Sequence, residues 1–145
     1  MRIVVVSGGF DPLHIGHLKY FEAAKKLGDT LVVGINSDEW LTRKKGNFFQ
    51  SWEDRSAIIR QLRMVDQVYA FNDRDDTALD LLYTVRKLFP TDQLIIANGG
   101  DRTPLNNAEA PFSLCDSNHI FVYGVGGIRK ENSSSLILKR WKELP

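Results

Sequence analysis

Hydrophobic and polar positions alternate between two patterns along the chain. Short apolar runs lie at 3–6, 30–35, 92–97 and 119–123, and a fifth, more polar run lies at 65–71. Runs of this length, bounded by Gly, Ser, Asn or Asp, are typical of strands that are buried in a sheet. The fifth run mixes polar with apolar residues, so we expect its strand nearer a sheet edge.

Segments with helical spacing separate these runs. The clearest begins at Ile15, where Leu18, Phe21, Ala24 and Leu27 recur on one face. Further helices are expected over 39–43, from about 52, from about 77 and after 133. Strands that alternate with helices predict an α/β fold with right-handed crossovers. We expect a Rossmann-like, doubly wound sheet of about five parallel strands in the order 3-2-1-4-5, with helices on both faces.

Composition narrows the class of protein. The 145 residues are 43% hydrophobic and 26% charged, the balance of one globular domain, which we expect to span 1–145. With a net charge of +1, the chain lacks the excess of positive charge that attracts nucleic acid or an anionic membrane, so neither partner is expected. The single cysteine, Cys115, fits a reducing compartment. The first apolar run is too short for a secretory signal, so we expect a cytoplasmic protein.

The turn after the first strand carries the strongest chemical signal. Gly8 and Gly9 end the strand, and His14, Gly16 and His17 surround the start of the following helix. Free N–H groups and the positive end of a helix dipole meet at such a turn, which suits phosphate. The two imidazoles add N–H donors that can face the same pocket. The alternatives are two ordinary surface histidines or a zinc site, but no third or fourth ligand appears at metal spacing, so no metal ligand is assigned.

A second glycine turn, at 98–101, follows the fourth strand. In the predicted order, strands one and four flank the switch point of the sheet, where ligands bind. The two glycine turns then face each other across one crevice. Gly100 and Asp101 therefore lie at this crevice, although Asp101 is equally typical of an aspartate that satisfies backbone N–H groups in a turn.

The segment 8–17, GGFDPLHIGH, resembles the G-x-F-D-x-x-H-x-G-H signature of the cytidylyltransferase-like nucleotidyltransferases, particularly the small glycerol-3-phosphate cytidylyltransferases. The resemblance implies transfer of CMP from CTP to a small phosphorylated acceptor, release of pyrophosphate, Mg²⁺ bound with the nucleotide, and a homodimer. It implies catalytic roles for His14 and His17 as donors to phosphate. It also implies that the nucleotide is contacted by Gly8, Gly9, Phe10, Asp11 and Gly16. The family has a glycine–aspartate turn that lines the nucleotide pocket, so the resemblance makes Gly100 and Asp101 candidate nucleotide contacts as well.

Basic residues supply further candidates. The family has a lysine that reaches the phosphates, and Lys45 falls at the matching place, with Lys44 as the substitute. Most such charge runs are simply solvated. The family also has arginines that match Arg55, a candidate phosphate or acceptor contact, and Arg63, a feature of cytidine-using members. Helix arginines with surface salt bridges are the alternative for both residues.

The last predicted helix opens with Ser133, Ser134 and Ser135. A serine triplet can cap a helix, or it can hold phosphate with its hydroxyls and N–H groups. The triplet matches the ending of the family's second signature, which cradles the triphosphate. Arg129 or Lys130 stands where the family often has an arginine, with altered spacing. The long connection 102–118 shows no periodicity and is a candidate for the acceptor side of the pocket.

Two other functions remain open from the sequence. An ATP-using adenylyltransferase of the phosphopantetheine or heptose-phosphate type shares much of the motif set, and His14 and Arg63 favour CTP over it. A nucleotide-binding sensor on the same scaffold would bind nucleotide without turnover, since a fold alone does not prove catalysis.

Overall fold

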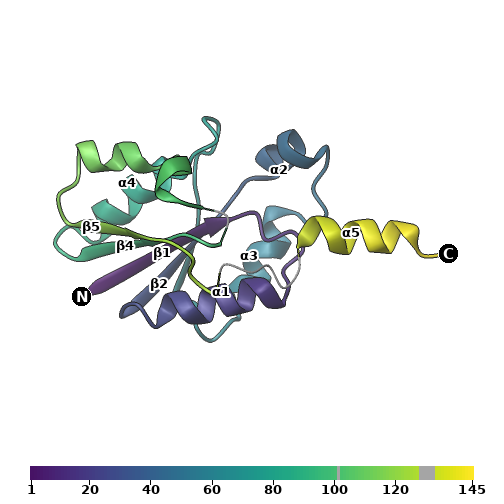
Figure 1. The fold of residues 1–145 in the computed structure, drawn as a ribbon, viewed down its shortest axis with the longest axis horizontal. Helices are drawn as coiled ribbons and strands as arrows, with labels where there is room; N and C mark the ends of the chain where they lie inside the picture. The colour runs from purple at the N-terminus through teal and green to yellow at the C-terminus, as the bar shows by residue number, and fades with distance from the viewer. Residues whose placement is uncertain (101, 128–132) are drawn as a thin grey trace.

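A computed structural model describes residues 1–100, 102–127 and 133–145 of the chain. Its centre is a parallel five-stranded sheet in the order β3-β2-β1-β4-β5 (Figure 1). The strands are β1 (Arg2–Gly8), β2 (Thr30–Ile35), β3 (Gln67–Ala70), β4 (Gln93–Ala97) and β5 (His119–Val122). The predicted fold class and strand order are confirmed, and the more polar third strand lies at an edge.

Helices fill the connections between the strands. They are α1 (Ile15–Lys25), α2 (Asp38–Lys45), α3 (Trp52–Arg60), α4 (Leu79–Leu88) and α5 (Ser134–Glu143). Two 3₁₀ helices, η1 (Pro104–Asn106) and η2 (Ala110–Leu114), interrupt the connection in which the sequence shows no periodicity. None of the described helices has the length and apolar character needed to cross a membrane.

Both faces of the sheet are covered by helices, so successive side chains of β1 are buried on opposite faces. Val4 and Val6 pack with α1 and α3, whereas Ile3 and Val5 pack with α4 and η2. All four valine and isoleucine side chains are at most 1% exposed. Each such burial stabilises the fold by about 1.5–3 kcal/mol. Figure 1 shows α1 and α3 on one side of the sheet and α4 on the other.

Close packing between α4 and β2 fixes the position of the start of α4. A Cβ atom at Gly34, in β2, would lie 2.3 Å from Cδ2 of Leu81. Only glycine lets α4 approach β2 this closely. The start of α4 is therefore held beside the carboxyl ends of the central strands.

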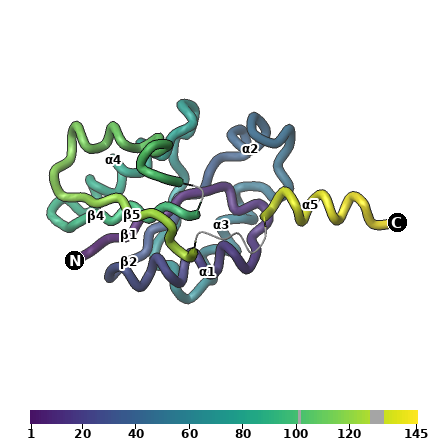
Figure 2. Tube along the Cα trace, in the orientation of Figure 1, coloured from purple at the N-terminus to yellow at the C-terminus, as the bar shows by residue number. Residues whose placement is uncertain are grey.

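The start of α5 is tied to the turn after β1, although the two segments lie far apart in the sequence. The Ser134 hydroxyl donates to the carbonyl oxygen of Pro12 at 2.8 Å. Beyond this tie the helix extends away from the sheet (Figure 2), and Trp141 and Leu144 are exposed. The helix N-terminus is thus brought to the carboxyl edge of the sheet.

Candidate nucleotide and phosphate site

A cavity of about 500 Å³ opens at the carboxyl edge of the sheet. The tip of β1, the start of α1, α2, the start of α4, the turn after β4 and the start of α5 all contribute to it. The cavity brings together eleven residues that the sequence singled out: Gly8, Gly9, Phe10, His14, Gly16, His17, Lys45, Gly100, Ser133, Ser134 and Ser135. The described parts of the chain contain no group of three His, Cys, Asp or Glu residues that could hold a metal ion.

The two histidines form the N-terminal cap of α1. Nδ1 of His14 accepts a hydrogen bond from the Gly16 backbone N–H at 3.0 Å, and Nδ1 of His17 accepts one from the His14 backbone N–H at 3.2 Å. Their rings stack with centroids 3.8 Å apart. An imidazole whose Nδ1 accepts a hydrogen bond must carry its proton on Nε2 when it is neutral. The cap therefore fixes the tautomer that offers Nε2–H as a donor.

The surroundings of His17 keep its ring neutral. Burial, together with the nearby His14 and Lys45, lowers the pKa of His17 to about 3. The edge of the Phe10 ring packs against it with centroids 5.0 Å apart. At neutral pH His17 is thus an uncharged hydrogen-bond donor, and a bound anion would favour the protonated form.

Glycines at the tip of β1 make room for this arrangement. A Cβ at Gly8 would lie 2.9 Å from the Phe10 ring, and a Cβ at Gly9 would lie 2.8 Å from Cδ2 of Leu41. Phe10 itself has a φ of 52°, in the left-handed region that side chains seldom adopt. The missing side chains let both the Phe10 ring and helix α2 approach the end of the strand.

Helix α2 brings Lys45 to the cavity. The Ser37 hydroxyl caps the helix by accepting from the Trp40 backbone N–H at 3.0 Å, and Gly46 ends it with a φ of 87°. Burial lowers the pKa of Lys45, against the opposing effect of Asp11. Lys44 does not line the cavity, and its ammonium lies 5.7 Å from the centre of the Trp40 ring.

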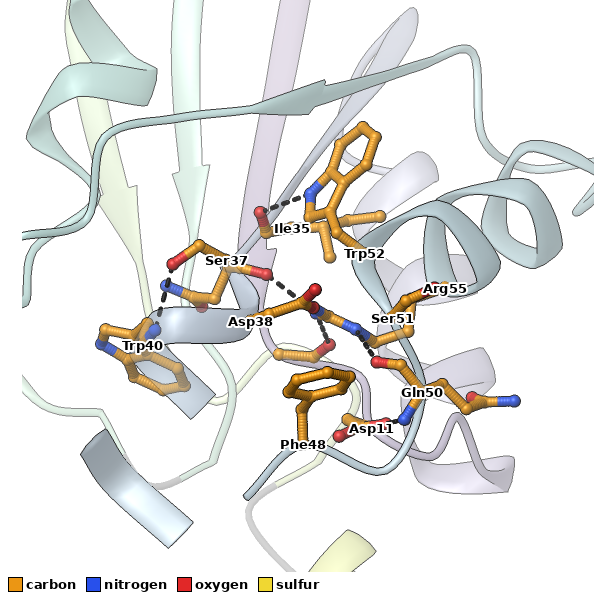
Figure 3. Close-up of polar contacts among 12 residues, drawn as sticks. Asp11, Ile35, Ser37, Asp38, Trp40, Phe48, Gln50, Ser51, Trp52 and Arg55 are labelled. Atoms are coloured by element: carbon orange, nitrogen blue, oxygen red, sulfur yellow. Dashed lines mark hydrogen bonds and ion pairs between the residues drawn. The ribbon is translucent and has the colours of Figure 1, made fainter. Parts of the chain in front are cut away.

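Asp11 and Arg55 lie behind the cavity and do not line it. The buried Asp11 carboxylate accepts from the backbone N–H groups of Phe49 and Gln50 at 2.6 and 2.7 Å. Arg55 is 1% exposed, and its guanidinium pairs with Asp38 at 2.6 Å. It also donates to the carbonyl oxygens of Gly9, Asn36 and Gln50 at 2.8–2.9 Å (Figure 3). In the structure both residues hold the loops that carry the site.

Of the remaining charged candidates, the structure describes only Arg63. Arg63 is exposed just after α3 and does not line the cavity. Asp101, Arg129 and Lys130 lie outside the described residues.

The serine triplet adds a second helix N-terminus to the cavity. Ser133 caps α5 by accepting from the Leu136 backbone N–H at 3.1 Å, and Ser134 donates to Pro12 as described above. The start of this ten-residue helix therefore lines the same cavity as the histidine cap. Two helix N-termini converging on one cavity favour a ligand with several anionic groups.

Among the residues that line the cavity, Lys19, Tyr20 and Trp40 were not singled out from the sequence, and Arg102 and Glu109 were included only as part of the connection 102–118. The Tyr20 hydroxyl donates to the carbonyl oxygen of Ala97, and burial raises the pKa of this phenol. Nε1 of Trp40 is buried without a hydrogen-bond partner among the described residues. Arg102 directly follows the second glycine turn, and that position was the available signal for it.

His119 and Cys115 lie away from the cavity. His119 bridges Asp116 at 2.8 Å and Ser113 at 3.0 Å, and Arg86 pairs with the same Asp116 carboxylate at 2.6 Å. Nε of Arg86 and Nδ1 of His119 bind different oxygens of this carboxylate, so Asp116 ties β5 to α4. Cys115 is exposed.

Fold and site together define an α/β protein with a cavity at the switch point of a parallel sheet, lined by groups that suit a polyphosphate. The family model for cytidylyltransferase-like proteins matches residues 5–78, half of the chain, and the chain therefore belongs to this family. Among curated proteins it is similar to the bifunctional protein HldE of Syntrophotalea carbinolica, with 41% identity over 104 residues, or 70% of this chain and 20% of that protein. The HldE protein of Geobacter sulfurreducens is 38% identical over the same share of both chains. The chain thus spans about a fifth of the length of these relatives.

Solved structures agree on the fold. A lipopolysaccharide core biosynthesis protein from Thermoplasma volcanium is 29% identical with a TM-score of 0.67, covering 85% of this chain and 95% of that one. A bifunctional NMN adenylyltransferase/ADP ribose pyrophosphatase from Francisella tularensis, complexed with AMP and a manganese ion, has a TM-score of 0.63 at 17% identity. This match covers 99% of this chain and 42% of the other, and it supports the fold alone.

Proposed function

We propose that the chain transfers a nucleoside monophosphate from a nucleoside triphosphate to the phosphate of a small acceptor and releases pyrophosphate. One observation carries this proposal: the histidine cap of α1, Lys45 and the N-terminus of α5 line one cavity. These groups are donors and positive charges aimed at a common volume, and they match the needs of a reacting triphosphate.

The reaction needs little covalent chemistry from the protein. A phosphomonoester has its second pKa at about 6, so it is largely dianionic at neutral pH and needs no general base. An acceptor oxygen attacks the α-phosphorus in line, a P–O bond forms, and the bond to the bridging oxygen of pyrophosphate breaks. His14 and His17 donate to α-phosphate and bridging oxygens, and Lys45 neutralises the growing charge. The serines and N–H groups of α5 hold the β- and γ-phosphates.

ATP is the proposed nucleotide. The expectation of CTP depended on His14 and Arg63, and of these Arg63 is exposed and does not line the cavity of the single chain. The matches to HldE proteins, at 38–41% identity, favour the alternative of an ATP-using enzyme of the heptose-phosphate type. Its acceptor would then be a sugar phosphate.

Mg²⁺ would enter with the nucleotide, held by phosphate oxygens and water. This assignment fits a cavity whose lining offers nitrogen donors and hydroxyls and contains Glu109 as its one described carboxylate. A homodimer and a cytoplasmic location complete the proposal, and both come from the sequence alone.

The test is a panel of the four nucleoside triphosphates against phosphorylated acceptors, including heptose 1-phosphate, hexose 1-phosphates and glycerol 3-phosphate. Pyrophosphate release is the readout. ATP is expected to give the highest kcat/KM with a sugar phosphate. Faster release with CTP would return the assignment to a cytidylyltransferase. Thermal stabilisation by ATP with no product from any acceptor would identify a nucleotide sensor.

A further inference from the structure

One charged pair, Arg102 and Glu109, lines the cavity beside the start of α4. Both residues belong to the connection between β4 and β5, and both line the cavity. Nη1 of Arg102 lies 3.5 Å from Oε1 of Glu109, and the two side chains are 36% and 8% exposed. The histidine cap and the serines lie at the ends of α1 and α5, so the pair faces a different part of the ligand.

Other contacts fix the orientation of both side chains. Oε2 of Glu109 accepts from the backbone N–H of Ala78 at 3.1 Å, at a helix start that lacks a side-chain cap of its own. The backbone N–H of Glu109 donates to Asn107, which in turn donates to the Tyr123 hydroxyl, each at 3.0 Å. Nη1 of Arg102 donates to the Asn106 carbonyl oxygen at 3.2 Å. The connection therefore holds the pair in place before any ligand binds.

The pair has unused hydrogen-bonding capacity. A carboxylate can accept about four hydrogen bonds and a guanidinium can donate five. Within the described chain, Oε1 of Glu109 meets only Arg102, at a distance longer than a good hydrogen bond. A buried carboxylate that is incompletely paired is costly, so a ligand that completes its hydrogen bonds is bound more strongly.

Charge decides which ligand group fits beside the pair. A phosphate is disfavoured next to Oε1 because two like charges about 4 Å apart repel by several kcal/mol at a protein surface. The start of α4 is already occupied by the Glu109 carboxylate. A group that contacts both partners meets a like charge whichever sign it carries, because an ammonium is repelled by Arg102 and a carboxylate by Glu109. A neutral hydroxyl can donate to Oε1 and accept from Arg102 at the same time.

We propose that Glu109 and Arg102 determine acceptor specificity by binding a hydroxyl group of the acceptor, so that the enzyme selects hydroxyl-bearing phosphomonoesters over cationic, anionic or alkyl ones. This inference depends on the proposed nucleotidyl transfer. Glu109 and Arg102 act as specificity residues at a distance from the reacting phosphorus.

The test compares four small phosphomonoesters with ATP and Mg²⁺: glycerol 3-phosphate, n-propyl phosphate, phosphoethanolamine and 3-phosphoglycerate. In the unmodified protein, kcat/KM for glycerol 3-phosphate should exceed that for propyl phosphate by about 10- to 100-fold. This factor corresponds to the free energy of one hydrogen bond to a charged group. Glu109→Gln keeps an oxygen for the Ala78 N–H but leaves Arg102 unpaired. It should reduce this ratio to near one and raise the relative rate of 3-phosphoglycerate, with KM for ATP unchanged.

Two further variants make the result decisive. Arg102→Gln leaves the carboxylate unpaired and should raise the relative rate of phosphoethanolamine instead. Glu22→Gln makes the same chemical change on the exposed face of α1 and should alter none of the ratios. If Glu109→Gln turns over glycerol 3-phosphate with unchanged selectivity, the pair does not read the acceptor and only this inference fails. If no acceptor in either panel releases pyrophosphate from the unmodified protein, the proposed function fails and this inference fails with it.

Discussion

At the scale of single residues, the histidine pair uses the same rings for folding and for chemistry. Each Nδ1 is committed to a backbone N–H group of the α1 cap, and this commitment places the proton of the neutral ring on Nε2. A substitution at either position can therefore affect the cap, the donor or both. Asparagine and glutamine separate these roles, because the asparagine oxygen can replace Nδ1 and the glutamine amide can replace Nε2–H.

His17→Asn should fold normally and lose about 10²–10³ in kcat, the usual effect of removing one donor to developing charge. The asparagine oxygen still accepts from the His14 backbone N–H, so the cap survives. His17→Gln should recover part of the rate while losing some thermal stability. Pyrophosphate release and thermal melts measure the two effects. A folded His17→Asn variant with near-normal turnover would refute the role of this ring.

Neutral His17 also makes stability depend on pH. Its pKa is about 3 in the folded chain against about 6.5 when unfolded, so below pH 6.5 the unfolded state binds the extra proton. Stability is complete above pH 6.5 and falls as the pH drops toward 3. Between pH 7 and pH 5 this residue should cost about 2 kcal/mol of unfolding free energy.

Urea denaturation at the two pH values, with His17→Asn as the control, measures this cost. The variant should lose about 2 kcal/mol less than the unmodified protein over the same range. Equal losses in both proteins would place the His17 pKa near its ordinary value.

At the scale of elements, α2 and the loop 46–51 carry Lys45 to the cavity, and two buried charges hold them there. Arg55 joins α3 to the end of β1 and to the turn after β2. Asp11 holds the loop through two backbone N–H groups. Both side chains are buried, unlike those of an ordinary surface salt bridge, which contributes little to stability.

Arg55→Ala should destabilise the protein by about 3–5 kcal/mol, because it leaves Asp38 and three carbonyl oxygens without their donor. Arg63→Ala is the matched control, an exposed arginine in the next segment, and should change stability by no more than about 0.5 kcal/mol. Chemical denaturation compares the two variants. Similar small losses from both would show that the Arg55 contacts contribute nothing to stability.

Gly9→Ala should reduce kcat/KM by moving α2, since the new Cβ would lie 2.8 Å from Cδ2 of Leu41. Leu41 is fully buried, so relief requires movement of the helix. Leu41→Ala on its own leaves a cavity, and in the double variant the smaller side chain should relieve the clash. A double-mutant cycle on pyrophosphate release is expected to give a favourable coupling, whereas additive effects would contradict direct contact.

At the scale of the whole molecule, the fold was largely predictable and the site was predictable only in part. The strand order follows from buried runs that alternate with amphipathic helices, and the histidine cap follows from a local motif. The sequence indicated the connection 102–118 as a candidate for the acceptor side but could not single out Glu109 within it, because its partner Ala78 lies 31 positions away and the segment has no periodicity. The helical register places Arg55 on the same face of α3 as Trp52 and Ile59, but it does not reveal the four groups that the guanidinium binds.

The sheet brings all of these groups to one edge, and the proposed nucleotidyl transfer requires a triphosphate to be held there. A crystal structure with Mg²⁺ and α,β-methylene-ATP, which cannot react at the α-phosphorus, tests this most directly. We expect the α-phosphate oxygens within about 3.2 Å of Nε2 of His17, and the β- and γ-phosphates at the first N–H groups of α5. Phosphates bound elsewhere, with both imidazoles still turned away from them, would contradict the account.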